Sequence, residues 1–247
     1  MVEAISDELA QALGQMHGVY RDVVNWGKGS LLVLAGPGSG KTRALTCRIA
    51  KLLRDSSGKH FRILALTFTN KAADEMRGRV DQLAPGQDQR LFIGTFHSFC
   101  AEVLRQHGSH LGINPDFRIY AARADLDAIL SDAVLALRPS YPQIRDADTR
   151  LLPVIERLKS KLIPPEDSAR HVVSDDLKDR IEVVYRAYED QLRELNALDF
   201  NSLVYYTHAL FKKFPAFAKR RNLSIDLRQF AGQITDSPPV CGWAPAG

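Results

Sequence analysis

The sequence predicts an α/β fold in which a parallel sheet is interrupted by an all-helical insertion. Apolar runs of strand length alternate with stretches of helical spacing between residues 31 and 104. A glycine-rich turn joins the first apolar run to the helix after it. From about residue 110 to 196 the apolar residues keep helical spacing, and no convincing strand is found. Alternating strands and helices favour parallel strands joined by right-handed crossovers.

Composition narrows the class of protein. The 247 residues are 45% hydrophobic and 25% charged, which is typical of a globular chain. The net charge of +4 and the pI near 9.0 permit a polyanionic partner without requiring one. No apolar run approaches the roughly 18 residues of a membrane span, and the first residues lack the basic and apolar regions of a signal peptide. Three cysteines without a CxxC pair argue against a disulfide framework or a zinc site, so we expect a reducing cytoplasm.

The first half of the chain predicts three strands, each followed by a helix. Residues 3–24 read as a helical lead-in, weakened by Gly14 and Gly18. The continuous apolar run Leu31–Ala35 predicts a strand buried on both faces. The elements expected after it are a helix from Lys41 to Leu53, a strand at 63–68, a helix at 72–83, a strand at 91–94 and a helix from Phe96 to Leu104. The sheet is expected to be incomplete at its carboxyl-terminal end.

The second half of the chain predicts helices punctuated by prolines. Apolar stripes at helical spacing cover residues 126–137, 151–162 and 177–195, and residues 200–217 form a further amphipathic stretch. We therefore expect three parts. These are an α/β domain built from 1–109 and 197–230, a helical insertion at 110–196, and an irregular tail at 231–247.

The glycine-rich turn predicts a phosphate-binding loop, or P-loop. Gly38 and Gly40 let consecutive N–H groups turn into one concave nest for phosphate oxygens, at the positive end of the following helix. Lys41 places a charge on the β and γ phosphates, and the Thr42 hydroxyl can bind Mg²⁺. The residues expected to contact the nucleotide are Gly36, Pro37, Gly38, Ser39, Gly40, Lys41 and Thr42. The alternative is an ordinary glycine-rich turn followed by a chance Lys-Thr pair, which the strand before it and the helix after it disfavour.

Three stretches resemble one family in order and spacing. Residues 31–50, 63–81 and 92–100 resemble motifs I, Ia and Ib of the UvrD/Rep/PcrA-like superfamily 1 DNA helicases. Ala197-Leu-Asp-Phe200 resembles the step by which that family's chain returns from its helical 1B subdomain. The resemblance covers residues 30 to about 215. It implies a RecA-like domain 1A with a 1B insertion, ATP and Mg²⁺ as cofactors, and single-stranded or partly duplex DNA as the partner.

The resemblance also implies DNA contacts after the second and third strands. These residues are Thr67, Phe68, Asn70, Lys71, Thr95, Phe96 and His97. A base can stack on Phe68, and such stacking is worth about 1–3 kcal/mol per base. The alternatives are a core position for Phe68, a helix N-cap for Asn70 and a structural hydrogen bond for His97.

Two further residues concern the adenine ring. Arg43 resembles the family's arginine that packs on the adenine face, and the alternative is a solvated helix charge. Tyr20 stands where the family has a glutamine that reads the edge of adenine. A tyrosine can stack, but it lacks the paired donor and acceptor with which an amide reads the edge of adenine.

The acidic pair that the family carries in D-E-x-Q is incomplete. Asp226 and Gln229 fall in register with that pattern, and Asp226 is the expected second Mg²⁺ ligand. Leu227 occupies the place of the general-base glutamate, and loss of a positioned base lowers a rate by roughly 10²–10⁴-fold.

Three functional hypotheses follow from these residues. The first is the N-terminal part of a 3′–5′ DNA helicase, truncated or divergent after about residue 217 and without its second RecA-like domain. The second is a degenerate nucleic-acid-binding module with a nucleotide site that does not hydrolyse. The third, a small-molecule P-loop kinase, would make two of the three motifs coincidental.

Overall fold

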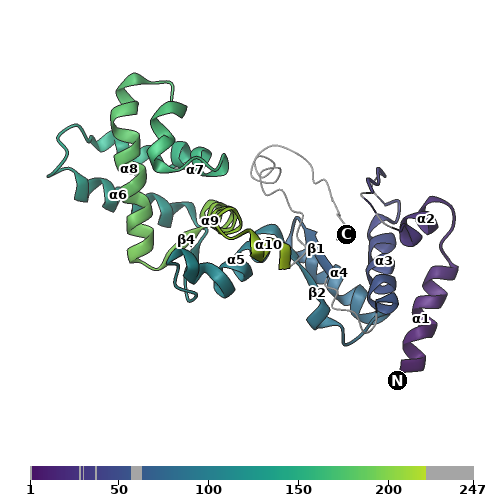
Figure 1. Ribbon diagram of the computed structural model, residues 1–247. Coiled ribbons are helices and arrows are strands. Elements are labelled where there is room, and N and C mark those ends of the chain that lie inside the picture. Colours follow the sequence, from purple (N-terminus) through teal and green to yellow (C-terminus); the bar gives the residue numbers. More distant parts are fainter. Residues whose placement is uncertain (1, 28, 30, 37, 57–62, 221–247) are drawn as a thin grey trace. The chain divides into compact units, whose positions relative to one another are not determined.

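The computed structural model describes residues 2–27, 29, 31–36, 38–56 and 63–220 (Figure 1). Within this part, the chain forms two compact units, one built from residues up to Phe99 and one from Cys100–Ala218. The fold is α/β and mostly helical, with two small parallel sheets. No helix in the described part has the length and apolarity needed to cross a bilayer.

The first unit packs helices around a two-stranded sheet. Its elements are α1 (Val2–Gly14), α2 (Val19–Asn25), α3 (Lys41–Asp55), β1 (Ile63–Thr67), α4 (Asn70–Leu83), the 3₁₀ helix η1 (Asp88–Arg90) and β2 (Leu91–Thr95). β1 and β2 are parallel, with Ile63 opposite Leu91 and Thr67 opposite Thr95. One apolar cluster joins α1, α3, α4 and both strands through Leu9, Ile49, Leu53, Ile63, Met76, Val80 and Ile93.

Leu31–Ala35 is not a strand, so the prediction of a strand buried on both faces is wrong. The side chains of Leu32 and Leu34 are 65% and 85% exposed, whereas their neighbours on either side are half-buried. This alternation is that of extended chain with one covered face. A strand buried on both faces needs hydrogen-bonded neighbours, and in the described part β1 and β2 pair only with each other.

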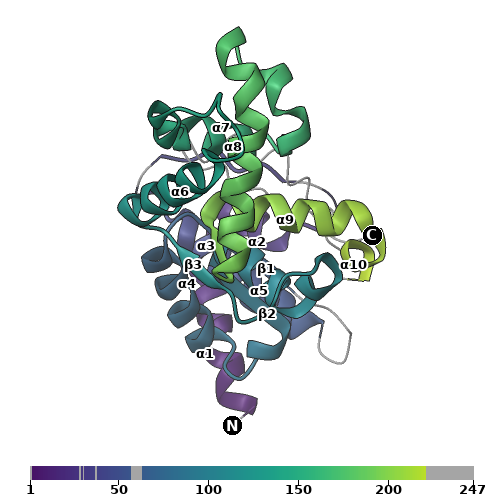
Figure 2. The same cartoon turned by 90° about the vertical axis from the view of Figure 1, so that its left-hand side faces the viewer.

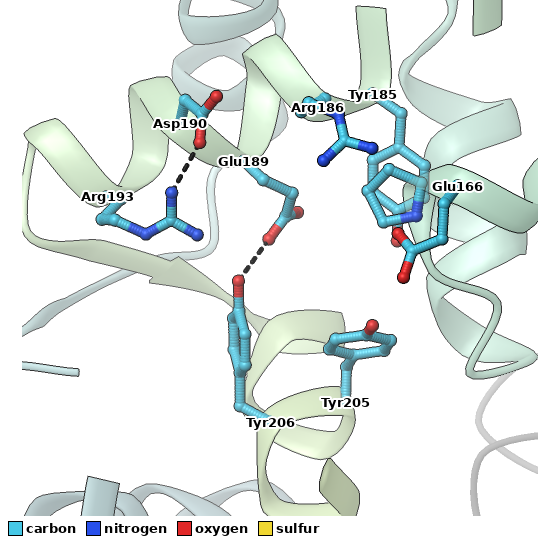
Figure 3. A pocket seen from close by; sticks show the side chains of 9 residues that line it. Glu166, Tyr185, Arg186, Glu189, Asp190, Arg193, Tyr205 and Tyr206 are labelled. Atoms are coloured by element: carbon cyan, nitrogen blue, oxygen red, sulfur yellow. Dashed lines mark hydrogen bonds and ion pairs between the residues drawn. The ribbon is translucent and has the colours of Figure 1, made fainter. Parts of the chain in front are cut away.

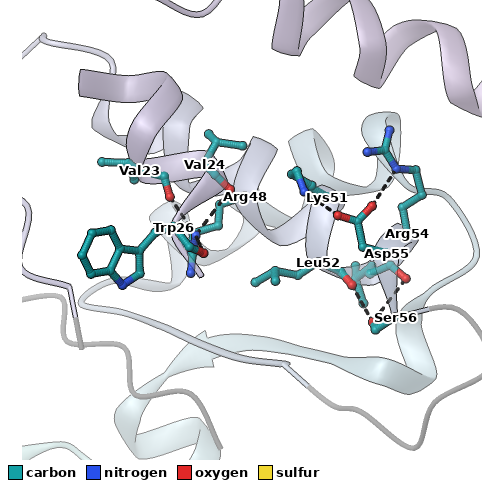
Figure 4. A network of polar contacts seen from close by, with 10 residues as sticks. Val23, Val24, Trp26, Arg48, Lys51, Leu52, Arg54, Asp55 and Ser56 are labelled. Atoms are coloured by element: carbon teal, nitrogen blue, oxygen red, sulfur yellow. Dashed lines mark hydrogen bonds and ion pairs between the residues drawn. The ribbon is translucent and has the colours of Figure 1, made fainter. Parts of the chain in front are cut away.

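The N-terminal helical lead-in is two helices, because the chain breaks between Gly14 and Val19, where Gly18 has a φ of 56°. Arg48 of α3 closes the end of α2: its Nη1 donates to the carbonyls of Val23 at 2.7 Å and Trp26 at 2.9 Å (Figure 4). The Val23 carbonyl also accepts from Trp26 N at 3.4 Å, so Arg48 adds a shorter hydrogen bond there and gives the Trp26 carbonyl a donor. The hydrogen bonds from Arg48 hold α2 against the helix that begins at the glycine loop.

The second unit contains the remaining elements. They are α5 (Phe96–His107), whose first turn belongs to the first unit, η2 (Gly108–Leu111), β3 (Arg118–Tyr120), α6 (Arg123–Leu137), η3 (Asp146–Arg150), α7 (Leu152–Ser160), η4 (Pro165–His171), α8 (Asp175–Glu194), β4 (Ala197–Asp199), α9 (Phe200–Lys213) and α10 (Pro215–Arg220). The long helix α8 packs against α6 and η4 (Figure 2). The core of the second unit is formed by buried residues that include Leu130, Val134, Leu152, Ile155, Ile181, Val184 and Tyr185.

The helical block also contains β3, which the apolar pattern of the sequence does not predict. β3 pairs in parallel with β4, with Arg118 opposite Ala197 and Tyr120 opposite Asp199. A three-residue strand whose first two side chains are exposed carries no alternating pattern that a sequence can show.

The boundary between the units differs from the boundaries predicted at 110 and 197. Residues 100–109 and 197–218 group with the helical block, because β4 pairs with β3 and α9 packs against α7. The assignment of 1–109 and 197–230 to one domain stays a prediction. The predicted irregular tail at 231–247 lies outside the described residues.

Candidate functional site

The glycine loop before α3 has the backbone that a P-loop requires at two positions. Gly38 has a φ of 72° and Gly40, the N-cap residue of α3, has a φ of 92°. Residues with a Cβ rarely adopt this left-handed region. A Cβ placed on either glycine would meet no atom within 4 Å, so the requirement comes from the backbone conformation and not from lack of space. Pro37 lies outside the described residues.

Two side chains fold back onto the start of this loop. Ser39 Oγ donates a hydrogen bond to the Gly36 carbonyl at 2.7 Å. Lys41 Nζ donates to the carbonyls of Ala35 and Gly36, each at 2.5 Å. Lys41 and Thr42 are both exposed, so the ammonium and the hydroxyl are accessible to a ligand at the start of α3.

The electrostatics at the start of α3 favour an anion. The first helical hydrogen bond runs from Ala44 N to the Gly40 carbonyl at 3.0 Å, so the amides before Ala44 have no partner within the helix. Gly40 supplies no side-chain cap, and the first turn has no acidic residue. Lys41 and Arg43 add two cations where the helix dipole is already positive, an arrangement that costs stability unless an anion binds there.

Gln15 also belongs to this site, although no motif in the sequence predicts it. Arg43 Nη2 donates to Gln15 Oε1 at 2.6 Å, and both side chains are exposed. Tyr20, which occupies the family's glutamine position, is half-buried and packs against a cluster that includes Met16 and Cys47. The contact between Gln15 and Arg43 joins residues 28 positions apart, so a local sequence pattern cannot predict it. The one sequence signal for Gln15 is its place in the turn between α1 and α2.

The predicted DNA-contacting residues meet at one edge of the β1–β2 sheet. β1 ends at Thr67 and β2 at Thr95, and the parallel register places these two threonines opposite each other. Phe68 follows directly and is 60% exposed, so it is not a core residue. Thr67 Oγ1 donates to the carbonyls of Thr69 at 3.0 Å and Gly94 at 3.4 Å.

Two helices begin at this edge, and each is capped by a threonine. Thr69 Oγ1 accepts from Ala72 N at 3.1 Å and caps α4, so the expectation that Asn70 is the N-cap is wrong. Thr95 Oγ1 accepts from Ser98 N at 3.2 Å at the start of α5. Asn70 is the first residue of α4 and, like Lys71, is exposed. Both helix N-termini therefore direct their positive ends to this edge.

His97 lies half-buried in the first turn of α5, one residue after the half-buried Phe96. Burial holds the pKa of His97 below its usual value. A neutral imidazole is therefore favoured at neutral pH, and it can serve as a hydrogen-bond donor more readily than as a cation.

The residues that match the family's D-E-x-Q pattern are not among those that the structure describes. Asp226, Leu227 and Gln229 lie outside the described residues. Within the described ranges, no group of three or more His, Cys, Asp or Glu side chains is arranged to hold a metal ion. Thr42 is thus the one predicted Mg²⁺ ligand that the structure describes.

Comparison with known proteins identifies the family. The model of the UvrD/REP helicase N-terminal domain matches residues 18–227. The ATP-dependent DNA helicase PcrA of Staphylococcus epidermidis is 36% identical over 200 residues, which cover 81% of this chain and 27% of that protein. The PcrA of Staphylococcus aureus is 35% identical over 204 residues, covering 82% and 27%. The probable DNA helicase II homolog of Mycoplasma capricolum is 38% identical over 183 residues, covering 73% and 25%.

The chain thus spans about a quarter of the length of these relatives. The matched residues include the glycine loop, the β1–β2 edge and the helical block. The resemblance inferred from the three motifs is confirmed, and the chain belongs to the UvrD/REP helicase N-terminal domain family.

Proposed function

We propose that this chain is the ATP-binding and single-stranded-DNA-binding part of a UvrD-like 3′–5′ DNA helicase, with a RecA-like domain and a helical 1B insertion. The observation that carries the proposal is the glycine loop, in which Gly38 and Gly40 have positive φ values and lead directly into the uncapped start of α3. In the intact parent, ATP hydrolysis would drive translocation along DNA in a cytoplasmic setting, together with a second RecA-like domain.

The residues at this loop fit a magnesium–triphosphate group. The unpaired amides of the first turn and the ammonium of Lys41 are suited to phosphate oxygens, and the exposed Thr42 hydroxyl is suited to Mg²⁺. The bound metal would neutralise charge on the β and γ phosphates. Lys41 would exchange the two loop carbonyls that it now contacts for phosphate oxygens, and Arg43 would lie beside the base with its orientation fixed by Gln15.

The edge formed by Thr67, Phe68 and Thr95 is the proposed DNA surface. The exposed ring of Phe68 offers a stacking platform, and the two helix N-termini offer amides and positive dipole ends to the phosphates. Contacts of these kinds position a strand without reading its sequence. We therefore expect binding of single-stranded DNA with little preference among bases.

The nucleotide half is tested with Lys41→Ala and with Lys51→Ala as the matched control. Lys51 lies on the same helix α3 but pairs with Asp55 at 2.5 Å, away from the loop. ATP affinity, measured by titration of a fluorescent analogue and competition with ATP, is expected to fall about tenfold or more in Lys41→Ala, because a charge-assisted hydrogen bond is worth about 1.5–3 kcal/mol. Equal affinities in the two variants would contradict the proposed loop function.

The DNA half is tested with Phe68→Ala, and Leu135→Ala serves as the control. Leu135 is 55% exposed on α6 and thus equally accessible, but it does not lie on the sheet edge. The affinity for a fluorescent oligothymidine is expected to fall at least fivefold in Phe68→Ala only, from the loss of about 1–3 kcal/mol of stacking. The wild-type affinity should also decline steeply with salt, because phosphate contacts release counterions. An affinity independent of salt would argue against those contacts.

A degenerate, non-hydrolysing module is the second candidate, and Leu227 is the observation that favours it. ATP turnover with and without single-stranded DNA separates the two functions. Nucleotide binding without DNA-stimulated turnover would support the degenerate site. Turnover that disappears in Lys41→Ala but persists in Lys51→Ala would support hydrolysis by this chain and would show that Leu227 does not prevent it.

A further inference from the structure

A pocket of about 310 Å³ lies in the second unit, between η4, α8 and α9 (Figure 3). Glu166 comes from η4, Arg186 and Glu189 from α8, and Tyr205 and Tyr206 from α9. The carboxylates of Glu166 and Glu189 and the hydroxyl of Tyr206 face the same space. This volume is at the lower end of the range for small-molecule sites. Neither the glycine loop nor the β1–β2 edge contributes to it.

One lining residue, Glu189, belongs to a buried group of charges in the second unit. The side chain of Lys159 has no exposed surface, and its Nζ lies 2.6 Å from Glu189 Oε1 and 2.7 Å from Asp199 Oδ2. The same ammonium donates to Ser202 Oγ at 2.5 Å. One buried cation is thus shared by two carboxylates, of which Glu189 is 10% and Asp199 2% exposed.

Neutral donors complete the remaining hydrogen bonds of these carboxylates. Tyr188 OH donates to Asp199 Oδ2 at 3.0 Å, and Tyr206 OH donates to Glu189 Oε2 at 2.8 Å. Hydrogen bonds from hydroxyls stabilise a carboxylate but add no charge. The buried group therefore keeps an excess of one negative charge, and Glu189 brings that charge to the pocket wall. Buried charge of one sign is costly unless a counter-charge lies nearby.

Arg186 and Arg193 offset part of this charge, and Arg193 also interacts with the Tyr206 hydroxyl. They are outnumbered by the nearby carboxylates of Glu166, Glu182, Glu189 and Asp190, so an excess of negative charge remains. Arg186 Nη2 lies 3.0 Å from Glu182 Oε1, and Arg193 Nη1 lies 2.5 Å from Asp190 Oδ1. Glu166 adds a further carboxylate at the opposite wall, and no ion pair of Glu166 is found within the described residues.

The pKa values of Tyr205 and Tyr206 are raised in part by negative charge nearby. Burial, followed by the charges of Glu166 and Glu189, raises the pKa of Tyr205. Burial and the adjacent Glu189 raise the pKa of Tyr206 as well. In both cases negative charge nearby disfavours the phenolate.

We propose that this pocket binds an organic cation, an ammonium or guanidinium group carried on an alkyl chain. The carboxylates of Glu166 and Glu189 would supply the counter-charge, and the rings of Tyr205 and Tyr206 would contact the alkyl stem and the cation. The same negative charge disfavours phosphate, so the pocket is not a continuation of the DNA surface. The cation can belong to an arginine or lysine side chain of a protein, or to a free polyamine.

The test is a calorimetric titration of the full chain with N-acetyl-arginine amide and, separately, with spermidine. We expect saturable one-to-one binding of at least one of them, weakened about fivefold in Glu166→Gln, the equivalent of about 1 kcal/mol. Asp132→Asn is the matched control, because Asp132 is an exposed carboxylate of α6 that does not line the pocket. Tyr205→Leu should weaken binding as well, while circular dichroism verifies that each variant is folded.

Three outcomes would overturn the proposal. The first is no binding of either cation by the folded wild-type chain. The second is equal loss in Glu166→Gln and Asp132→Asn, which would indicate general charge attraction. The third is equal or tighter binding of N-acetyl-citrulline amide, which is uncharged, or of thymidine monophosphate. Tighter binding of the arginine derivative would indicate a protein side chain as the source, and tighter binding of spermidine a polyamine. Because the pocket and the glycine loop share no residue, Lys41→Ala should leave cation binding unchanged.

Discussion

Gln15 Oε1 accepts a hydrogen bond from Arg43 Nη2 at 2.6 Å, which ties the turn after α1 to the first turn of α3. An arginine that is held in one orientation beside the phosphate loop loses less conformational freedom when a nucleotide binds. The amide of Gln15 lies next to the same guanidinium and has both a donor and an acceptor.

Gln15→Ala is expected to weaken ATP binding about threefold to tenfold. The physical reason is loss of the acceptor that orients Arg43, a hydrogen bond to a charged group worth about 1 kcal/mol at an exposed site. Gln11→Ala is the control, because Gln11 is exposed on α1 one turn earlier. Competition titrations with ATP and GTP give the measurement, and ATP affinity that is the same in both variants would show that the Gln15–Arg43 contact has no role in binding.

Gly40→Ala is expected to lower the free energy of unfolding by about 1–2 kcal/mol, although a Cβ there meets no neighbour within 4 Å. The cost arises because Gly40 has a φ of 92° and an alanine would be strained in that conformation. Gly36→Ala is the comparison: it has equal space and no positive φ, so its cost should stay within about 0.5 kcal/mol. Urea unfolding of the two variants decides whether backbone conformation, and not volume, requires glycine at residue 40.

Gly94→Ala is expected to destabilise the chain for the opposite reason. A Cβ on Gly94 would lie 2.7 Å from Ser98 Oγ and 2.9 Å from the Phe92 ring, and overpacking of this kind costs about 1–3 kcal/mol. Gly78, in the middle of α4, has open space, so Gly78→Ala should stabilise the chain by up to about 1 kcal/mol. Thermal unfolding should therefore shift in opposite directions for the two substitutions, and a shift in the same direction would refute this reading of residue 94.

Lys159→Met is expected to cost about 3–5 kcal/mol of unfolding free energy, because it leaves the carboxylates of Glu189 and Asp199 buried without their cation. Lys161→Met, two residues along the chain at an exposed position, should change stability by less than about 0.5 kcal/mol. Chemical denaturation of both variants is the measurement. A small effect of Lys159→Met would mean that water or a rearranged side chain compensates the two carboxylates.

The same buried group sets a pH dependence of stability. Burial opposes ionisation of Asp199, but the adjacent Lys159 holds the pKa of Asp199 below its usual value. The contribution of Asp199 is therefore present above about pH 4 and is lost as the pH falls through its folded-state pKa. Burial also opposes the charge on Lys159, but Asp199 and Glu189 raise its pKa, so its contribution is present below about pH 10 and is lost at higher pH.

Denaturation measured between pH 3 and pH 11 tests this dependence. In the wild type, the contribution of Asp199 and Lys159 to the free energy of unfolding should be constant between about pH 5 and pH 9. In Lys159→Met the buried carboxylate of Asp199 lacks its cation, so the pKa of Asp199 should rise and the variant should become more stable as the pH falls from 8 towards 5. Parallel pH profiles for the wild type and the variant would contradict the assignment of these charges.

Local features of the structure could be predicted because they depend on nearby residues. The apolar spacing after Lys41 predicts α3, and the short runs near residues 65 and 93 predict β1 and β2. The need for glycine at residue 40 also follows from local turn chemistry. By contrast, the apolar run Leu31–Ala35 predicts a buried strand that the structure does not contain, because an apolar run does not specify which strands will pair with it.

Side-chain partners that lie far apart in the chain could not be predicted. Lys159 sits in a helical stripe where a lysine is ordinarily solvated, and its burial depends on Glu189 and Asp199, which lie 30 and 40 residues away. The contact between Gln15 and Arg43 is non-local in the same way, because it requires α1 and α3 to pack together.

The family, the glycine loop and the residues that follow the two paired strands can all be predicted from the order of the amino acids. Periodicity and turn chemistry act within a few residues, so they can be read without knowledge of the packing. Only the tertiary structure placed Thr67 opposite Thr95, buried Lys159 between two carboxylates and opened the pocket beside Glu189. Those features depend on which distant segments pack together, and on the charges and volumes that meet there.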